Sequence, residues 1–322
     1  MPKNMRAIGV HEYGGPEALE ILDLPEPVPG PGEVRIRVHA AAVNPTDTLL
    51  RAGAHAARLA GHRPPYVPGM DAAGVVDLLG PDVDDRLRPG QRVIALVVPT
   101  GVHGGAYAEQ IVVPAASVVP APDGVDLAAA STLLMNALTA RLAVDALELS
   151  RGQTLAVTGP AGAFGGYAVQ LAKADGLRVI ADAAPKDEQL VRDLGVDEVL
   201  ARGDGLAERI RAVEPDGVPG VADGALLNEQ VLPAIADGGG LSVVRGWQGA
   251  VDRGITVHPI LVSNSATDTA ALTRLAEQAE AGVLTLRVAE VLPASEAVRA
   301  HRLLEAGGIR GRLVLDFGEA NS

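Results

Sequence analysis

A glycine-rich segment between a strand-like run and a helix-like run is the strongest constraint on how this 322-residue chain folds. Residues 157–166 read VTGPAGAFGG, after the apolar run 154–158 and before the helical pattern 164–173. In such a turn the backbone can approach a diphosphate closely, and free amides at the helix start bind its charge. The spacing is a variant of G-x-G-x-x-G, and such a pattern also arises by chance in a chain with 38 glycines. The alternative is a structural turn that binds no ligand. The strand before the glycines and the helix after them favour a dinucleotide site. The residues expected to contact a dinucleotide are Gly159, Gly162, Ala163, Phe164 and Gly165.

The rest of the chain changes character twice. From residue 126, with Asp126 as the N-cap of an Ala- and Leu-rich helix, short apolar runs alternate with helical patterns up to residue 258. Apolar strands separated by helices predict a parallel sheet covered on both faces. Residues 1–125 show short strands punctuated by Pro and Gly, which suits an antiparallel, barrel-like domain, and residues 259–322 can complete it. The predicted class is α/β, with the 126–258 domain inserted into a domain made of 1–125 and 259–322.

Composition excludes several classes of protein. The chain has no cysteine, which removes disulfides, thiolate nucleophiles and iron–sulfur clusters. Its net charge of −13 repels nucleic acid and anionic lipid, and no apolar run approaches the ~18 residues of a membrane span. With no signal-peptide pattern at the N-terminus, we expect a cytoplasmic protein without nucleic-acid or membrane partners.

Charged residues after the next two predicted strands bear on the choice of cofactor. Asp182 lies 20 positions after Gly162, where an acid that binds the adenosine ribose favours NAD. Lys186 and Arg202 are cations that suit the 2′-phosphate of NADP, although Lys186 also reads as an ordinary solvated lysine. These residue types leave NADPH and NADH both open.

Several segments together resemble the medium-chain dehydrogenase/reductase superfamily, in its zinc-independent quinone oxidoreductase (zeta-crystallin-like) branch. The resemblance implies a GroES-like catalytic domain with an inserted Rossmann domain, and a homodimer that pairs through the edge strand near residues 254–262. In NAD-specific relatives the acid stands one position later, at Ala183; a one-residue shift on a strand turns the side chain away, which favours NADPH. The segments that carry the resemblance are the glycine loop and residues 42–47 (AVNPTD), 65–76 (PYVPGMDAAGVV), 105–109 (GAYAE), 138–140 (LTA) and 308–315 (GIRGRLVL).

The same comparison implies that no metal is bound. Zinc-dependent relatives have a Cys at the position of Asn44 and Gly-His-Glu at the positions of Gly69, Met70 and Asp71. Neither Asn nor Met suits Zn²⁺. None of the seven histidines forms an i, i+3 or i, i+4 pair with another histidine.

The resemblance also places residues near the nicotinamide and the substrate. It implies that Asn44 hydrogen-bonds a substrate carbonyl, stabilising the developing oxyanion, or an amide of the cofactor. It also implies that Asp47 orients its neighbours unless burial raises its pKa; the alternative for the pair is an Asx-type cap. The resemblance implies that Thr139 and Gly246 contact the cofactor. The alternative for Thr139 is a residue inside a helix whose hydroxyl bonds to the helix backbone. Leu49 stands where many relatives have a Tyr. Trp247, by its place after a sheet strand, is expected either to wall the substrate pocket or to pack at a domain interface.

The predicted function is therefore NADPH-dependent hydride transfer, without metal, to a small-molecule acceptor that is a quinone or an α,β-unsaturated carbonyl compound. Two alternatives stay open. One is an enoyl-thioester reductase of the same fold, for which Arg51, Arg58 and Arg63 would form a basic rim. The other is a non-catalytic NADPH-binding protein.

Overall fold

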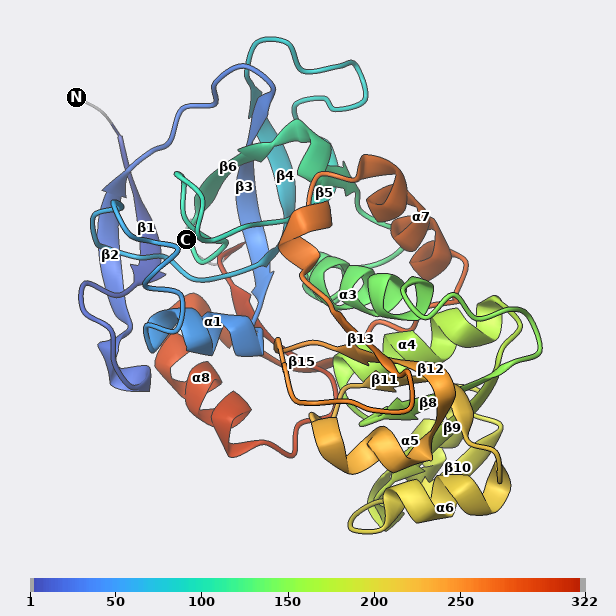
Figure 1. Ribbon diagram of the computed structural model, residues 1–322. Helices are drawn as coiled ribbons and strands as arrows, with labels where there is room; N and C mark the ends of the chain where they lie inside the picture. The colour runs from blue at the N-terminus through green and yellow to red at the C-terminus, as the bar shows by residue number, and fades with distance from the viewer. Residues whose placement is uncertain (1–2, 319–322) are drawn as a thin grey trace. The chain divides into compact units, whose positions relative to one another are not determined.

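The computed structural model describes residues 3–318 and divides the chain into two units (Figure 1). Unit 1 comprises Met1–Met135, Ser263–Glu280 and Leu286–Ser322, and unit 2 comprises Asn136–Val262 and Ala281–Thr285. The sequence placed the corresponding boundaries earlier in the chain, at 125/126 and 258/259.

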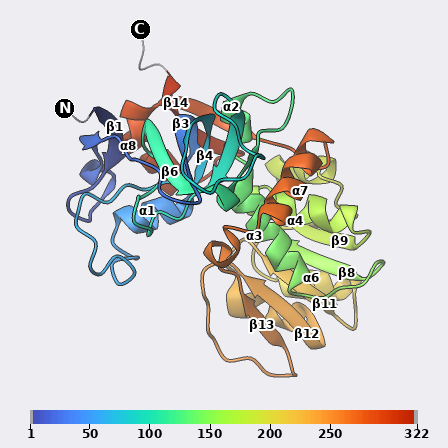
Figure 2. The same ribbon diagram turned by 90° about the horizontal axis from the view of Figure 1, so that it is seen from above.

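Unit 2 is built on a six-stranded parallel sheet whose strand order is β10-β9-β8-β11-β12-β13. Figure 2 shows β9, β8, β11, β12 and β13 following one another in this order. The chain starts in the middle at β8, winds outward through β9 and β10, and then crosses to β11 on the other side. This is the doubly wound order, and its ligands bind beyond the carboxyl ends of the strands where the winding reverses. The strands are β8 (Thr154–Thr158), β9 (Arg178–Ala183), β10 (Glu198–Ala201), β11 (Val218–Asp223), β12 (Ile235–Val243) and β13 (Thr256–Pro259).

The helices of unit 2 follow the expected alternation. Strands β8, β9 and β11 are almost entirely buried, which explains why they read as apolar runs in the sequence. The helical elements are α3 (Leu134–Asp145), α4 (Ala163–Ala174), η3 (Pro185–Asp187), α5 (Glu188–Asp193), α6 (Leu206–Val213) and the 3₁₀ helix η4 (Asn228–Ala234).

Strand β12 differs from the prediction. The sequence predicts apolar strands between helical patterns here, but β12 begins at Ile235 and runs through three glycines. A Cβ on Gly239 would lie 2.8 Å from the Pro219 carbonyl oxygen, and one on Gly240 would lie 2.7 Å from a Leu147 side-chain carbon. These glycines therefore serve close packing inside a strand, and their turn-like composition hid the strand in the sequence.

Unit 1 contains the sheet that the first part of the sequence predicts, and it is antiparallel except where β14 pairs parallel with β15. Its seven strands run in the order β14-β15-β3-β4-β5-β7, with β6 also paired to β3; the C-terminal β15 pairs antiparallel with β3 and thereby joins the end of the chain to its beginning. The hairpin β1–β2 stands beside it. The strands are β1 (Asn4–Gly9), β2 (Glu20–Pro25), β3 (Glu33–Ala42), β4 (Asp71–Leu79), β5 (Arg92–Leu96), β6 (Gln110–Pro114), β7 (Val118–Pro120), β14 (Val288–Pro293) and β15 (Arg312–Asp316).

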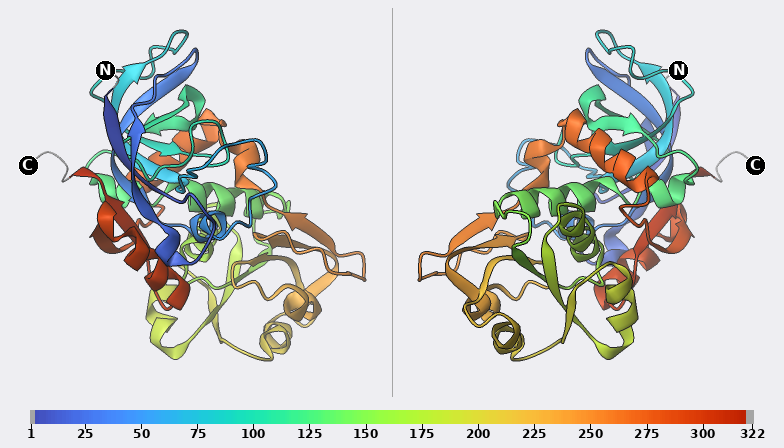
Figure 3. Two further views of the ribbon diagram at one scale, coloured as in Figure 1. Left: turned by 90° about the vertical axis from the view of Figure 1, so that its left-hand side faces the viewer. Right: turned by 90° about the vertical axis from the view of Figure 1, so that its right-hand side faces the viewer.

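Two helices of unit 1 that are distant in the sequence lie side by side. Helix α1 (Pro45–Arg51) contacts helix α8 (Ala297–Ala306), and both contact the 3₁₀ turn η1 (Pro16–Ala18). Both views of Figure 3 show α8, in red, against the blue N-terminal part of the chain. The other helical elements of unit 1 are η2 (Ala115–Ser117), α2 (Leu127–Ala130), η5 (Val262–Ser265), α7 (Thr269–Glu280) and η6 (Ala294–Glu296).

The Ala- and Leu-rich helix predicted to begin at Asp126 is broken into α2 and α3. Asp126 is the N-cap of α2, and its carboxylate accepts a hydrogen bond of 2.8 Å from the Ala129 N–H. Within residues 3–318, the stretch Leu127–Asp145 is the one helical segment long and apolar enough to cross a membrane; 72% of its apolar window is buried in the protein, as in a core helix.

Candidate functional site

The glycine loop joins β8 to α4 in a conformation that requires glycine at two positions. Gly159 has φ +65°, in the region that favours glycine. A Cβ on Gly165 would lie 2.5 Å from the Gly159 carbonyl oxygen, so only glycine lets the helix pass this close to the turn. Gly162 is the exposed N-cap of the twelve-residue helix α4, whose first amides have no partner within the helix. The loop therefore presents backbone N–H groups and the positive end of a helix dipole to an anion.

Asp182 supports this loop. Its Oδ1 accepts a hydrogen bond of 2.7 Å from the Gly159 N–H, and its Oδ2 lies 3.7 Å from the Arg202 Nε. Burial raises the pKa of Asp182, opposed by the Gly159 hydrogen bond and the Arg202 charge. From the sequence, Asp182 was considered only as a ligand of the adenosine ribose, whereas in the structure its carboxylate accepts a hydrogen bond from the glycine turn.

The two predicted 2′-phosphate cations lie at the carboxyl ends of neighbouring strands. Arg202 follows β10, and its N–H donates to the Ala183 carbonyl at the end of β9. Lys186 lies in η3 just after β9; it is exposed and makes no hydrogen bond or ion pair with any residue in the described range 3–318. The structure thus brings Arg202 to Asp182 and the glycine loop, and it leaves Lys186 available at the same edge of the sheet.

A second buried carboxylate at this edge was missed by the sequence analysis. Asp223, at the end of β11, accepts hydrogen bonds from the Thr158 hydroxyl (2.5 Å) and from the N–H groups of Leu227 (3.1 Å) and Asn228 (2.7 Å). It fastens the end of β8 to the loop after β11, and the aspartate that closes an apolar strand was the available signal. The ring of Phe164 lies against Gly224, the next residue, where a Cβ would come within 2.8 Å of it.

The other predicted contacts in unit 2 occupy different positions. Gly246 is exposed with φ +67° in the loop after β12, and Trp247 packs, half-buried, against the core of unit 2. Thr139 is buried on α3, and Ala163 begins α4. The assignment of Thr139 and Gly246 to the cofactor and of Trp247 to the substrate pocket stays a prediction.

In unit 1, Asn44 and Asp47 form the start of helix α1. Asn44 is the N-cap, and its N–H donates to the Asp47 Oδ2 at 2.7 Å, an arrangement that the Asx-cap alternative anticipated. The Asn44 Nδ2 donates to the Asp71 Oδ2 at 2.9 Å and to the Ala42 carbonyl at 3.3 Å. Both Asn44 and Asp47 are fully buried. Leu49, half-buried, stands on the same helix.

Asp47 collects three further contacts. Its Oδ1 accepts from the Gly69 N–H at 3.1 Å, its Oδ2 accepts from the Tyr107 hydroxyl at 3.1 Å, and the Arg312 guanidinium acts on it electrostatically. Burial nevertheless raises the pKa of Asp47 to about 7. A pKa raised by burial is what Asp47 needs in order to donate a proton as well as orient its neighbours.

Arg51 does not form part of an exposed basic rim. Arg58 and Arg63 are exposed, but Arg51 is 3% exposed and its guanidinium contacts Gly14, His301 and Glu305 within unit 1. The expectation of a rim containing Arg51 is therefore wrong, because this arginine is a buried structural group.

The donor set around Asn44 does not fit a zinc ion. The Asn44 amide nitrogen is engaged with Asp71 and Ala42, and the Met70 sulfur accepts a hydrogen bond of 3.2 Å from the Thr46 hydroxyl. Among residues 3–318, no group of three or more His, Cys, Asp or Glu side chains is arranged to hold a metal ion.

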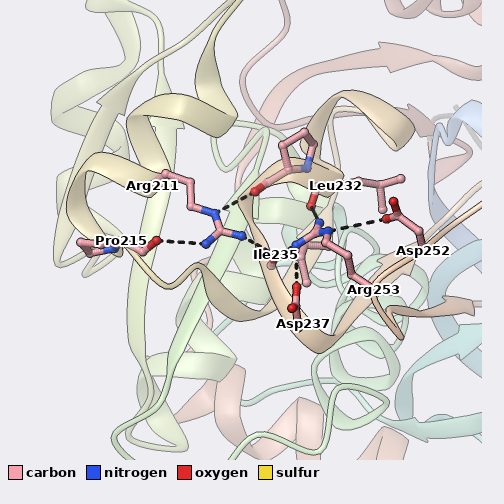
Figure 4. Close-up of polar contacts among 8 residues, drawn as sticks. Arg211, Pro215, Leu232, Ile235, Asp237, Asp252 and Arg253 are labelled. Carbon is pink, nitrogen blue, oxygen red and sulfur yellow. Dashed lines mark hydrogen bonds and ion pairs between the residues drawn. The ribbon is translucent and has the colours of Figure 1, made fainter.

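A hollow in unit 2 lies at the amino end of β12 (Figure 4), whereas the glycine loop follows the carboxyl end of β8. Two arginines line it, and their N–H groups donate to backbone carbonyls: Arg211 to Pro233, Pro215 and Ile235, and Arg253 to Ile235 and Leu232. Arg253 also contacts Asp237 and Asp252. Because these donors are already used, the arginines hold the loop and offer little to a ligand.

Known proteins match almost the full length of the chain, and two family models match parts of it. Residues 30–123 match the family model of the alcohol dehydrogenase GroES-like domain, and residues 194–315 match that of the zinc-binding dehydrogenases. The quinone oxidoreductase of Sus scrofa is 28% identical over 97% of this chain and 98% of its own length.

Solved structures agree in fold. An NAD-dependent alcohol dehydrogenase superposes with a TM-score of 0.84 at 31% identity, covering 98% of this chain and 100% of that one. A mycobacterial protein solved in complex with NADPH has a TM-score of 0.84 at 30% identity, covering 97% and 99%. The first of these proteins is thus named for NAD, and the second was solved with NADPH.

Proposed function

Because this chain belongs to the medium-chain dehydrogenase/reductase superfamily, in the branch of the quinone oxidoreductases, we propose that it is an NADPH-dependent reductase that acts without a metal on a quinone or an α,β-unsaturated carbonyl compound. At the coarser level, it is an NAD(P)-dependent oxidoreductase with a nicotinamide cofactor. The preference for NADPH, the class of acceptor and the independence from metal are the proposal.

The observation that carries the proposal is the glycine loop. Its geometry fits a dinucleotide, because glycine is required at 159 and 165 and the amides of the first turn of α4 have no partner within the helix. These amides bind the diphosphate, and Asp182 holds the turn in place through the Gly159 N–H. When bound, NADPH supplies the hydride.

The charges at the strand ends support NADPH. Lys186 is exposed and unpaired among the described residues, and Arg202 has 48% of its side chain exposed. Both are available to a 2′-phosphate. The buried Asp182 is already engaged with Gly159 and Arg202, which reduces its capacity to bind a ribose hydroxyl.

The residues in unit 1 support a reaction without a metal. Asn44 and Met70 are engaged in other hydrogen bonds, which supports a reaction that needs no Lewis acid to polarise an alcohol oxygen. Reduction of a conjugated C=C bond or of a quinone is easier, because the developing negative charge spreads onto the carbonyl oxygen. Asn44 as donor to that oxygen stays a prediction, and it requires the Asn44 amide to release Asp71 or the Ala42 carbonyl. The homodimer, the cytoplasmic location and the absence of nucleic-acid and membrane partners stay predictions too.

The function is tested by NADPH oxidation measured in parallel against quinones, enones and enoyl thioesters, with and without a metal chelator. We expect turnover with quinones or enones that the chelator leaves unchanged. Turnover confined to the thioesters would favour the enoyl-thioester reductase. Cofactor binding without turnover on any acceptor would favour a non-catalytic protein.

The cofactor preference is tested at Lys186, whose side chain holds nothing else in place. Lys186→Glu is expected to weaken NADPH binding about 10- to 100-fold and to change NADH binding little, because it replaces a cation beside the 2′-phosphate with an anion. Binding is measured by titrating Trp247 emission with each cofactor. The matched control is Arg192→Met, which removes a nearby exposed cation that pairs with Glu188. Equal losses for both cofactors in Lys186→Glu would contradict the assignment.

A further inference from the structure

Four hydrogen-bonded side chains cross the interior of unit 1. The Tyr107 hydroxyl lies 3.1 Å from the Asp47 Oδ2 and 3.3 Å from the His301 Nε2. The Nδ1 of His301 lies 3.3 Å from an Arg51 guanidinium nitrogen. All four side chains are at most 3% exposed, and none of them belongs to the glycine loop or the 2′-phosphate cations.

The arginine gives this chain of hydrogen bonds a direction. A guanidinium only donates, so the Nδ1 of His301 must accept and the proton of the neutral ring must lie on Nε2. The Nε2–H then donates to the Tyr107 oxygen. The Tyr107 hydroxyl proton is left to donate to Asp47, which receives it as an ionised acceptor.

The remaining partners of Asp47 reinforce this direction. The N–H groups of Asn44 and Gly69 are donors, so a proton on Asp47 finds an acceptor only in the Tyr107 oxygen. Tyr107 would then have to donate to His301, and His301 would have to carry its proton on Nδ1. That proton would face the Arg51 N–H, two donors opposed with no acceptor between them.

We propose that Arg51 and His301 are positioning residues for Asp47: Arg51 fixes the Nε2–H tautomer of His301, and the resulting one-way relay through Tyr107 stabilises the ionised form of Asp47 that shapes the turn at Asn44. The relay opposes the cost of burying the carboxylate. Asp47 in turn accepts the Asn44 N–H and so fixes the residue at the start of α1.

The other charged groups around the relay come from every element packed on it. Asp71 on β4 raises the pKa of Asp47, and Arg312 on β15 lowers it. On α8, Glu305 pairs with Arg51 at 2.5 Å, and on η1 the exposed Glu17 also feels the Arg51 charge. Burial and the Arg51 cation lower the pKa of His301 to about 3, which is consistent with a neutral ring that accepts from Arg51.

The tautomer is tested in the unmodified protein by ¹⁵N NMR of labelled histidine, with the His301 signal assigned by its loss in His301→Gln. The proposal expects a protonated Nε2 and an unprotonated Nδ1 at pH 8. A His301 protonated on Nδ1, or an even mixture of the two tautomers, would overturn it.

Two variants separate the steps of the relay. Arg51→Met should release the tautomer into a mixture, whereas Tyr107→Phe should leave His301 protonated on Nε2. Both should raise the pKa of Asp47, followed by ¹³C NMR of its carboxyl carbon, by about one unit, the usual worth of a lost hydrogen bond to a charged group. The control Glu305→Gln removes the surface partner of Arg51 and should change neither signal. An unshifted Asp47 pKa in Tyr107→Phe would sink the proposal even if Arg51→Met does not fold.

A kinetic measurement extends the test and rests on the proposed function. If Asn44 assists the reaction, Tyr107→Phe should lower kcat while leaving NADPH binding unchanged, because it disturbs unit 1 and not the glycine loop. A raised Asp47 pKa in Tyr107→Phe without any change in kcat would support the relay and would show that Asn44 does not assist the reaction. A change in kcat with an unshifted Asp47 pKa would contradict the relay and keep the proposed function.

Discussion

Gly165→Ala is expected to reduce dinucleotide binding by at least about 100-fold. The new Cβ would lie 2.5 Å from the Gly159 carbonyl oxygen, 2.8 Å from its carbon and 2.9 Å from the Pro160 Cα, and all three are backbone atoms that cannot rotate away. The turn must therefore move off the helix, which strains its hydrogen bond to Asp182 and displaces the amides that bind the diphosphate. Overpacking of this kind costs about 1–3 kcal/mol of stability, so unit 2 should still fold.

Gly162→Ala is the matched control for the stability effect. Gly162 has φ −77° and ψ 171°, which alanine adopts freely, and its Cβ would lie 3.3 Å from the Gly159 oxygen. We expect Gly162→Ala to unfold at nearly the wild-type temperature and Gly165→Ala several degrees lower. Isothermal titration with NADPH measures the binding of each variant. Unchanged affinity in Gly165→Ala would mean that the diphosphate is bound elsewhere and would remove the main support for the proposed function.

The sheet of unit 2 could be predicted because its signals are local. Strands β8, β9 and β11 are mostly apolar runs of five or six residues separated by helical patterns, and the glycines of the loop stand at a strand-to-helix turn that needs them. Strand β12 could not be read in the same way. Gly238 to Gly240 look like a turn in the sequence, and only the approach of Pro219 and Leu147 reveals why a strand needs glycine there.

The surroundings of the candidate site are less accessible to sequence reasoning, because they depend on contacts between distant segments. Asp182 had the right spacing for a ribose ligand, but its bond to the Gly159 N–H becomes visible only when β8 and β9 are placed in register. Arg51 looked like a surface cation until α8 brought His301 and Glu305 to it from 250 and 254 residues away. The sequence shows that such residues are charged, but only the fold determines which group forms a hydrogen bond or ion pair with each of them.

Replacing either Asp47 or His301 should change the pH dependence of stability in opposite directions. The pKa of Asp47 is raised from 3.8 to about 7, so the folded protein holds an extra proton between these values and its stability falls as the pH rises through them. The pKa of His301 is lowered from 6.5 to about 3, so the folded protein lacks a proton there and its stability rises with pH over that range. Each shift corresponds to about 4 kcal/mol. Between about pH 4 and 6.5 the two effects nearly cancel in the wild type, although the raised pKa of the buried Asp71 adds to the Asp47 side.

His301→Gln removes the rising component, so the stability of the variant should itself fall by about 4 kcal/mol between pH 4 and 7, where the wild type changes little up to about pH 6.5. Asp47→Asn removes the falling component, and its stability should instead increase from about pH 3 to 6.5. The double variant should follow the shape of the wild-type profile, because both titrations are absent. Urea unfolding followed by far-UV circular dichroism measures these profiles, while Trp247 emission reports separately on unit 2, which carries neither substitution. Parallel profiles for the wild type and His301→Gln would show that His301 is protonated equally in the folded and unfolded chains, and the buried, neutral imidazole at the centre of the relay would have to be abandoned.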